Sequence, residues 1–139
     1  MSLFNRLAGT KEITLTPQAG LLLAAVTMVA IDGDVDDDEL AIIRRLDGSG
    51  TTKDWDAAVK TWKAQPLETC IELAAKAMDS DQQLVAIANL IDIAMADGIL
   101  VGAEQQLLEI YLKTFKVDAR EVEKIVDVIA TKNNKSIFN

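Results

Sequence analysis

The sequence predicts an all-α protein, and three observations lead to this class. Half of the 139 residues are apolar but only 4% are aromatic, and prolines occur only at positions 17 and 66. Strands of a sandwich or barrel need more aromatic and β-branched residues and more frequent turn signals. Apolar side chains also recur at spacings of three and four, as on one face of a helix. We therefore expect about seven helices in a single compact, bundle-like domain, residues 1–139.

The first expected helix is the central one. Thr16 and Pro17 are a typical N-cap and first-turn pair, and the apolar run 19–31 follows before the helix stops at Gly33. The run is shorter than the ~20 residues that cross a bilayer, so direct membrane insertion is not expected. A capping box of Asp36 and Glu39 opens the second helix, which ends near residue 46.

The later helices are bounded by similar signals. A third helix is expected over 53–64, with Trp55, Val59 and Trp62 on one face, and a fourth over 67–78 after a proline. Asp79 or Ser80 caps a fifth helix that ends at residue 98, and a sixth covers 103–115. A seventh covers 119–132, and the tail 133–139 is expected to be polar and frayed. The expected inward residues are Leu84, Ile87, Ala88, Ile91 and Met95 in the fifth helix, and Val122, Ile125, Val126 and Ile129 in the seventh.

A short sequence motif occurs twice, and the two copies are 65 residues apart. Asp32-Gly33 is followed by Glu39, and Asp97-Gly98 is followed by Glu104. The same offset relates apolar positions, such as Leu22 to Ile87 and Val26 to Ile91. The sequence therefore predicts an internal pseudo-two-fold repeat of helical hairpins, whose two halves cover about residues 16–64 and 80–132. We call residues 32–39 the first elbow and residues 97–104 the second elbow.

Charge and cysteine content restrict the partners. The net charge is −8, and six of the acids lie in the first elbow, so the remaining residues carry only −2. Such a surface is repelled by phosphate backbones, which argues against nucleic acid as a partner. The lone Cys70 cannot form a disulfide within the chain and is expected to be a small buried hydrophobe. With no export signal near residue 1, a cytoplasmic location is expected.

The candidate functional site lies in the two elbows, and we expect it to bind a metal ion. An aspartate in the last turn of a helix meets the negative end of the helix dipole, and neighbouring carboxylates repel one another, so a bound cation would reverse several unfavourable terms. Histidine is absent, and an all-oxygen ligand set suits Ca²⁺, Mg²⁺ or Mn²⁺, with Ca²⁺ favoured for its higher coordination number. The expected metal ligands are Asp32, Asp34, Asp36 and Glu39, completed by Asp97 or Glu104.

Structural roles compete with this interpretation. Glu39 can serve only as the partner in a capping box, and the acids at 36–38 can simply favour the positive end of a helix. The second elbow carries the apolar run Ile99-Leu100-Val101, which favours a contact surface over a ligand-poor metal loop. The two elbows are therefore not expected to be equivalent.

The repeated helix ending in Asp-Gly, with an early glutamate in the next helix, resembles the TerB family of tellurite-resistance proteins. The residues that carry the resemblance are 30–39 in the first half, and 95–98 with Glu104 in the second, within a similarity over about 16–129. The resemblance implies a helical domain of two related halves with an acidic metal-binding region. It also implies a role in bacterial tellurite resistance or stress response, beside membrane-embedded partners of the same system. The family's acidic positions fall on Asp32, Glu39, Asp97 and Glu104.

Three kinds of function remain open. The leading one is a non-enzymatic metal-binding accessory or sensor protein. The alternative is a metal-independent helical protein–protein interaction module that uses residues 99–101 or the Trp55 and Trp62 face. A metal-assisted carboxylate enzyme is least favoured, because the chain has no histidine base and no serine or cysteine with a recognisable activating partner.

Overall fold

The computed structural model describes residues 13–31, 33, 37–48, 50–96 and 102–138, with residues 37–39 and 42 described by backbone alone. Most of these residues are helical and none is in a strand, so the all-α prediction is confirmed for the described part. The helices in chain order are α2 (Pro17–Ala30), α3 (Asp37–Arg44), α4 (Lys53–Ala64), α5 (Leu67–Ala77), α6 (Ser80–Ala94), α7 (Ala103–Thr114) and α8 (Ala119–Asn133), followed by the 3₁₀ helix η1 (Lys135–Phe138).

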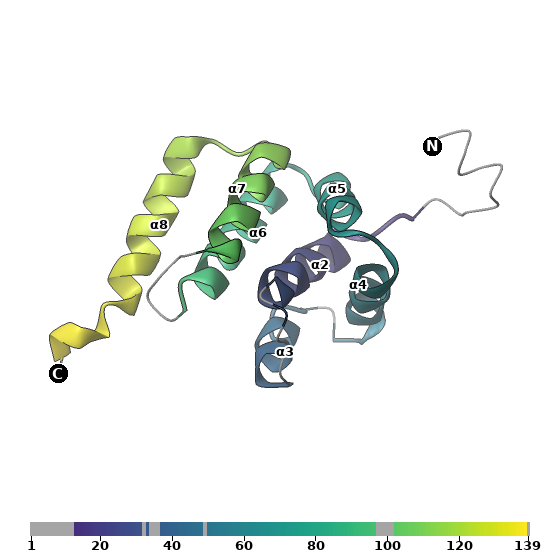
Figure 1. Ribbon diagram of the computed structural model, residues 1–139, viewed down its shortest axis with the longest axis horizontal. Helices are drawn as coiled ribbons and strands as arrows, with labels where there is room; N and C mark the ends of the chain where they lie inside the picture. The colour runs from purple at the N-terminus through teal and green to yellow at the C-terminus, as the bar shows by residue number, and fades with distance from the viewer. Residues whose placement is uncertain (1–12, 32, 34–36, 49, 97–101, 139) are drawn as a thin grey trace.

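Helix α2 lies at the centre of the molecule (Figure 1). It contacts α4 and α5 on one side and α6 and α7 on the other, and α3 also packs against it. Its residues 22–28 are all buried, because the helix is apolar almost all round. The prediction of a central core helix is confirmed.

The helix boundaries follow the predicted signals closely. The Thr16 hydroxyl accepts a hydrogen bond from the Ala19 amide at 3.1 Å, and it donates to the Asp54 carboxylate at 2.7 Å, which ties the start of α2 to α4. Asp79 caps α6 through a capping box with Gln82. Asp118 caps α8 by accepting from the Arg120 amide.

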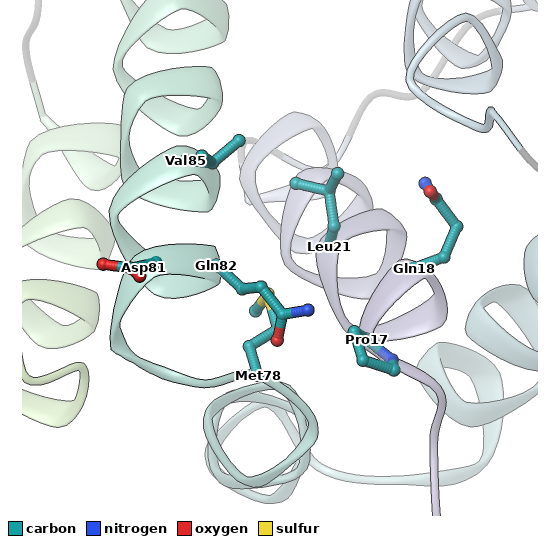
Figure 2. Close-up of a pocket in the computed structure, with 7 residues that line it drawn as sticks. All are labelled: Pro17, Gln18, Leu21, Met78, Asp81, Gln82 and Val85. Carbon is teal, nitrogen blue, oxygen red and sulfur yellow. The ribbon is translucent and has the colours of Figure 1, made fainter.

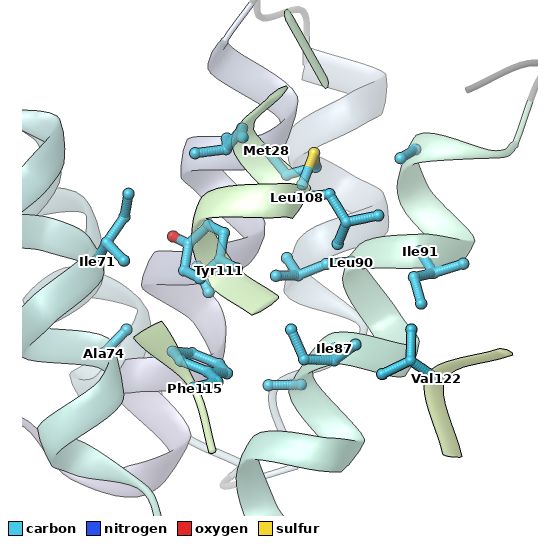
Figure 3. Packing of buried hydrophobic residues seen from close by; sticks show 14 of the residues in the cluster. Met28, Ile71, Ala74, Ile87, Leu90, Ile91, Leu108, Tyr111, Phe115 and Val122 are labelled. Atoms are coloured by element: carbon cyan, nitrogen blue, oxygen red, sulfur yellow. The ribbon is translucent and has the colours of Figure 1, made fainter. Parts of the chain in front are cut away.

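The core forms two clusters, and α2 contributes to both. One cluster lies among α2, α5, α6, α7 and α8 and includes Met28, Leu90 and Tyr111 (Figure 3). The other lies among α2, α3, α4 and α5 and includes Val26 and Cys70. Each large apolar side chain buried in these clusters contributes roughly 1.5–3 kcal/mol to folding.

The buried polar side chain of Gln83 joins elements of the first cluster. The Gln83 amide donates to the Ala75 and Met78 carbonyl groups at 3.0 and 3.3 Å, and its oxygen accepts from the Lys116 amide at 2.9 Å. These bonds connect α6 to the end of α5 and to the segment after α7. The sequence pattern gave no indication of this role, because Gln83 directly follows Gln82 in a polar stretch and resembles a surface residue.

The buried face of α6 differs from the predicted one. Ile87 and Ile91 are buried as expected, but Leu84 and Ala88 are half-buried and lie at the edge. The face is centred on Gln83, Ala86, Ile87, Leu90, Ile91 and Ala94. The prediction was wrong because α6 has apolar residues on more than one face. Packing against α2 and α7 determines which of these faces is buried.

The buried face of helix α4 also differs from the predicted one. Its buried residues are Ala58 and Thr61, whereas Trp55, Val59 and Trp62 are half-buried. The small side chains allow α4 to approach α2 closely, and the two tryptophans pack beside that contact against the second core cluster.

The C-terminal tail also departs from expectation. Helix α8 continues to Asn133, and residues 135–138 form η1 instead of a frayed polar segment. Ile137 and Phe138 are 70% and 85% exposed. The inward positions of α8 are confirmed for Val122 and Ile129, which are buried, whereas Ile125 and Val126 are half-buried.

Candidate metal centre

Most of the predicted metal ligands fall outside the described part of the chain. Asp32, Asp34, Asp36 and Asp97 lie outside the described residues, as does the apolar run 99–101. Glu39 lies in the first turn of α3, where only its backbone is described, and Glu104 is a half-buried residue in the first turn of α7. Among the described side chains, no group of three acids or thiols is placed to hold a metal ion.

The first elbow begins where α2 ends. Ile31 is the C-cap residue of α2, and the Gly33 amide donates to the Ala30 carbonyl group at 3.0 Å. Gly33 has φ +90°, a left-handed conformation that other residues adopt only with strain. The predicted stop at Gly33 is therefore confirmed, and the glycine is required by the backbone geometry of the turn.

The second elbow begins earlier than predicted. Helix α6 ends at Ala94 with Met95 as its C-cap residue, so it does not extend to residue 98. Asp97 and Asp32 lie outside the described residues, so their predicted positions relative to these helix ends stay predictions.

The end of α6 is held by α8. The Asn133 side-chain amide donates to the Met95 carbonyl group at 3.1 Å, and Lys132 pairs with Asp92 at 3.1 Å. The ion pair is well exposed and contributes little by itself. The Asn133 bond, in contrast, satisfies a carbonyl group that the helix end leaves without an intrahelical partner.

Helices α2 and α6 run side by side in the same direction. Residues from their N-terminal turns, Pro17 and Leu21 of α2 and Val85 of α6, line one groove (Figure 2). Residues from their C-terminal turns, Met28 of α2 and Ala94 of α6, belong to one core cluster. Because the helices are about 21 and 22 Å long, their C-terminal residues Ala30 and Ala94 lie at the same end of the molecule.

A buried hydrogen bond fixes this end relative to α7. The Thr27 hydroxyl donates to the Ala24 carbonyl group at 2.7 Å and lies 2.5 Å from the Tyr111 hydroxyl. Since the single Thr27 proton is used, Tyr111 must be the donor between the two hydroxyl groups. Burial raises the pKa of Tyr111, so its phenol stays protonated and remains a donor. Sequence reasoning did not single out either residue.

Cys70 is not a metal ligand in this arrangement. It is fully buried in the second cluster, and its Sγ lies 3.7 Å from the Gln65 carbonyl oxygen. Burial raises the pKa of the thiol, which disfavours the thiolate that binds metals. The prediction of a small buried hydrophobe is confirmed.

The described surface also carries an apolar groove between α2 and α6. Its lining residues are Pro17, Gln18, Leu21, Met78, Asp81, Gln82 and Val85 (Figure 2). Leu21 and Val85 point toward each other across the groove, and Val85 is 57% exposed. Sequence reasoning missed this feature, although an exposed position for Val85 follows from the Gln83-centred buried face of α6.

Comparison with known proteins adds no relative. The chain matches no protein-family model, no curated protein and no solved structure. The resemblance to the TerB family therefore stays a prediction. No described helix combines the length and the apolar character needed to cross a membrane.

Proposed function

We propose that this chain is a non-enzymatic metal-binding accessory or sensor protein of a bacterial tellurite-resistance or metal-stress response system. It binds a divalent cation, Ca²⁺ in preference to Mg²⁺ or Mn²⁺, through the two elbows. The observation that supports the proposal is the parallel course of α2 and α6, because the helix ends that precede the two Asp-Gly motifs lie at one end of the molecule. The ligands are Asp32, Asp34, Asp36 and Glu39, completed by Asp97 or Glu104.

The proposed repeat is supported by equivalent packing. Helix α2 packs against α3 and α4, and α6 packs against α7 and α8, which are the same pairs shifted by 65 residues. Leu22 and Ile87 are both fully buried, as are Val26 and Ile91. About seven helices in two pseudo-two-fold halves, within one TerB-like domain, account for these correspondences.

As a sensor, the protein would convert ion binding into a change at the elbows. An ion neutralises the carboxylates and favours one angle between the helices that flank each elbow. The end of α6 is joined to α8 through the Asn133 contact to Met95, which lies two residues before Asp97 in the sequence. We propose a cytoplasmic protein that reports this change to a protein partner, such as a membrane protein of the same system.

Calorimetric titration tests the proposal. Chelator-stripped protein is titrated with Ca²⁺, Mg²⁺, Mn²⁺ and Zn²⁺, and we expect saturable binding of Ca²⁺ that both Asp32→Asn and Asp97→Asn weaken. A hundredfold excess over the dissociation constant stabilises the folded state by about 2.7 kcal/mol, which raises Tm by several degrees for a chain of this size. An unchanged Tm with all of these ions at millimolar concentration would reject the proposal.

The α2/α6 groove favours a second candidate, a metal-independent interaction module. Apolar carbon atoms of Pro17, Leu21, Met78 and Val85 line this groove, which is typical of surfaces that receive an apolar side chain. In that case Val85→Lys would abolish partner binding, whereas Asp32→Asn and Asp97→Asn would leave it intact.

A further inference from the structure

The α2/α6 groove combines an apolar floor with an acidic edge. Val85 lies on the α6 wall, and Asp81, one turn before it, lines the outer edge of that wall with its carboxylate directed away from α2 (Figure 2). Leu21 and Pro17 form the α2 wall, and Met78 lies between the two helices (Figure 2). The space of about 270 Å³ is large enough for one large apolar side chain.

The complementary feature is η1, at the other end of α6. Ile137 and Phe138 are the two most exposed large apolar side chains of the described residues. Side chains at positions i and i+3 of a 3₁₀ helix lie on the same side, so Lys135 and Phe138 project together. This pair, a cation beside an aromatic ring, matches the pair of Asp81 and Val85 in charge and in polarity.

The η1 segment cannot reach the groove of its own chain. Asn133 is bonded to the carbonyl group of Met95, at the C-terminal end of α6. Asp81 lies 14 residues earlier along the same helix, which is about 21 Å. The four residues of η1 span only about 8 Å, so an occupant of this kind must come from another molecule.

We propose that the groove receives η1 of a second copy of this chain, with Phe138 between Leu21 and Val85 and Lys135 beside Asp81. The contact is head-to-tail, because the two surfaces differ and lie at opposite ends of α6. Such a contact leaves a free groove and a free η1 in a dimer, so assembly continues until a ring closes or a filament grows. The association requires no metal ion and goes beyond the proposed function.

Sedimentation velocity over a range of protein concentrations, in the presence of a chelator, tests the proposal. With one aromatic anchor the dissociation constant should be on the order of 0.1–1 mM. Phe138→Ser and Val85→Lys should each weaken association about ten- to hundredfold. Val128→Ser is the matched control, because Val128 is also an exposed valine but lies on α8, and it should have no effect.

Charge reversal tests the predicted pairing. Asp81→Lys should weaken association about two- to fivefold, and adding Lys135→Asp in the same chain should restore it. Circular dichroism checks that each variant is folded, which we expect because both residues are exposed.

A peptide of residues 132–139 provides a direct probe. It is titrated into isotope-labelled full-length Phe138→Ser protein, and NMR shift changes should concentrate at Leu21, Met78 and Val85. Sedimentation independent of concentration, association that Phe138→Ser leaves unchanged, or peptide shifts centred on Ile125 and Val128 would each overturn the proposal.

Discussion

The hydroxyl groups of Thr27 and Tyr111 meet inside the core, and both residues are almost completely buried. Tyr111 also makes an edge-to-face contact with Phe115, with ring centroids 5.3 Å apart. The tyrosine therefore joins α7 to α2 by one hydrogen bond while its ring fills the core. A buried hydroxyl that loses its partner costs more than the net gain from making the bond.

This asymmetry predicts how strongly each of three variants destabilises the fold. Thr27→Val leaves the Tyr111 hydroxyl buried without its acceptor and should destabilise the fold by about 1–3 kcal/mol. Tyr111→Phe removes the donor, while Thr27 keeps its bond to Ala24, so about 0.5–1.5 kcal/mol is expected. The double variant should cost less than the sum of the two, as measured by urea unfolding. Additive costs would contradict the hydrogen bond between the two hydroxyl groups, and a larger cost for Tyr111→Phe than for Thr27→Val would contradict the assigned donor.

Tyr111 also predicts a loss of stability at alkaline pH. Because burial raises its pKa in the folded protein above the unfolded value near 10, the folded state keeps a proton that the unfolded state loses. The stabilisation is fully present below about pH 10, and stability then falls by about 1.4 kcal/mol per pH unit as the pH rises toward the folded pKa. Unfolding at pH 8–11 should show a shallower decline in Tyr111→Phe. Parallel pH profiles of the two proteins would contradict this account.

At the scale of elements, α2 and α5 approach each other closely at Gly20. A Cβ atom built on Gly20 would lie 2.8 Å from the Ala77 Cβ and 3.4 Å from the Ala74 carbonyl oxygen. The absence of a side chain therefore allows the two helices to approach. This is a packing requirement of the helix pair, because Gly20 lies inside α2 and has no unusual φ.

Gly20→Ala should consequently destabilise the protein. Alanine normally gains about 0.5–1 kcal/mol over glycine inside a helix, but overpacking costs about 1–3 kcal/mol, so a net loss of roughly 0.5–2 kcal/mol is expected. Adding Ala77→Gly should relieve the clash. Gly48→Ala is the control, since its Cβ would meet no atom within 4 Å. Denaturant unfolding in which Gly20→Ala equals or exceeds the parent protein would refute the close contact.

The positions of the helices in the sequence could be predicted better than the residues that each helix buries. Thr16, Asp79 and Asp118 mark helix starts through local hydrogen bonds between near neighbours in the chain. The buried face of α6 depends instead on which neighbours surround it, and these come from distant parts of the sequence. The Gln83 network could not be predicted for the same reason, because its acceptors and donor lie on other elements.

In the candidate site, too, features set by local sequence could be predicted, whereas features set by contacts between distant residues could not. The turn at Gly33 could be predicted, because an Asp-Gly pair after an apolar helix is a local signal. The end of α6 at Ala94 could not, since apolar residues continue beyond it and a contact from Asn133 helps to define the end. Whether acids from separate hairpins share one ion depends on how α2 and α6 pack, which no local pattern encodes.

At the scale of the whole molecule, the central claim is that both elbows contribute to one cation site. The packing of α2 supports it, because this helix joins the two core clusters and aligns α6 in parallel with itself. A site shared between halves would connect ion binding to the relative position of the helical hairpins. A site confined to the first elbow would leave the second half unaffected.

Paramagnetic broadening of NMR signals by Mn²⁺ tests this claim most directly. One bound Mn²⁺ should broaden the amide signals of both Gly33, which lies in the first elbow, and Ala96, which directly precedes the second elbow, and excess chelator should restore them. In Asp97→Asn, a variant of the second elbow, the broadening at Gly33 in the first elbow should be strongly reduced. Broadening at Gly33 that Asp97→Asn leaves unchanged, or no selective broadening near either elbow, would contradict a shared site.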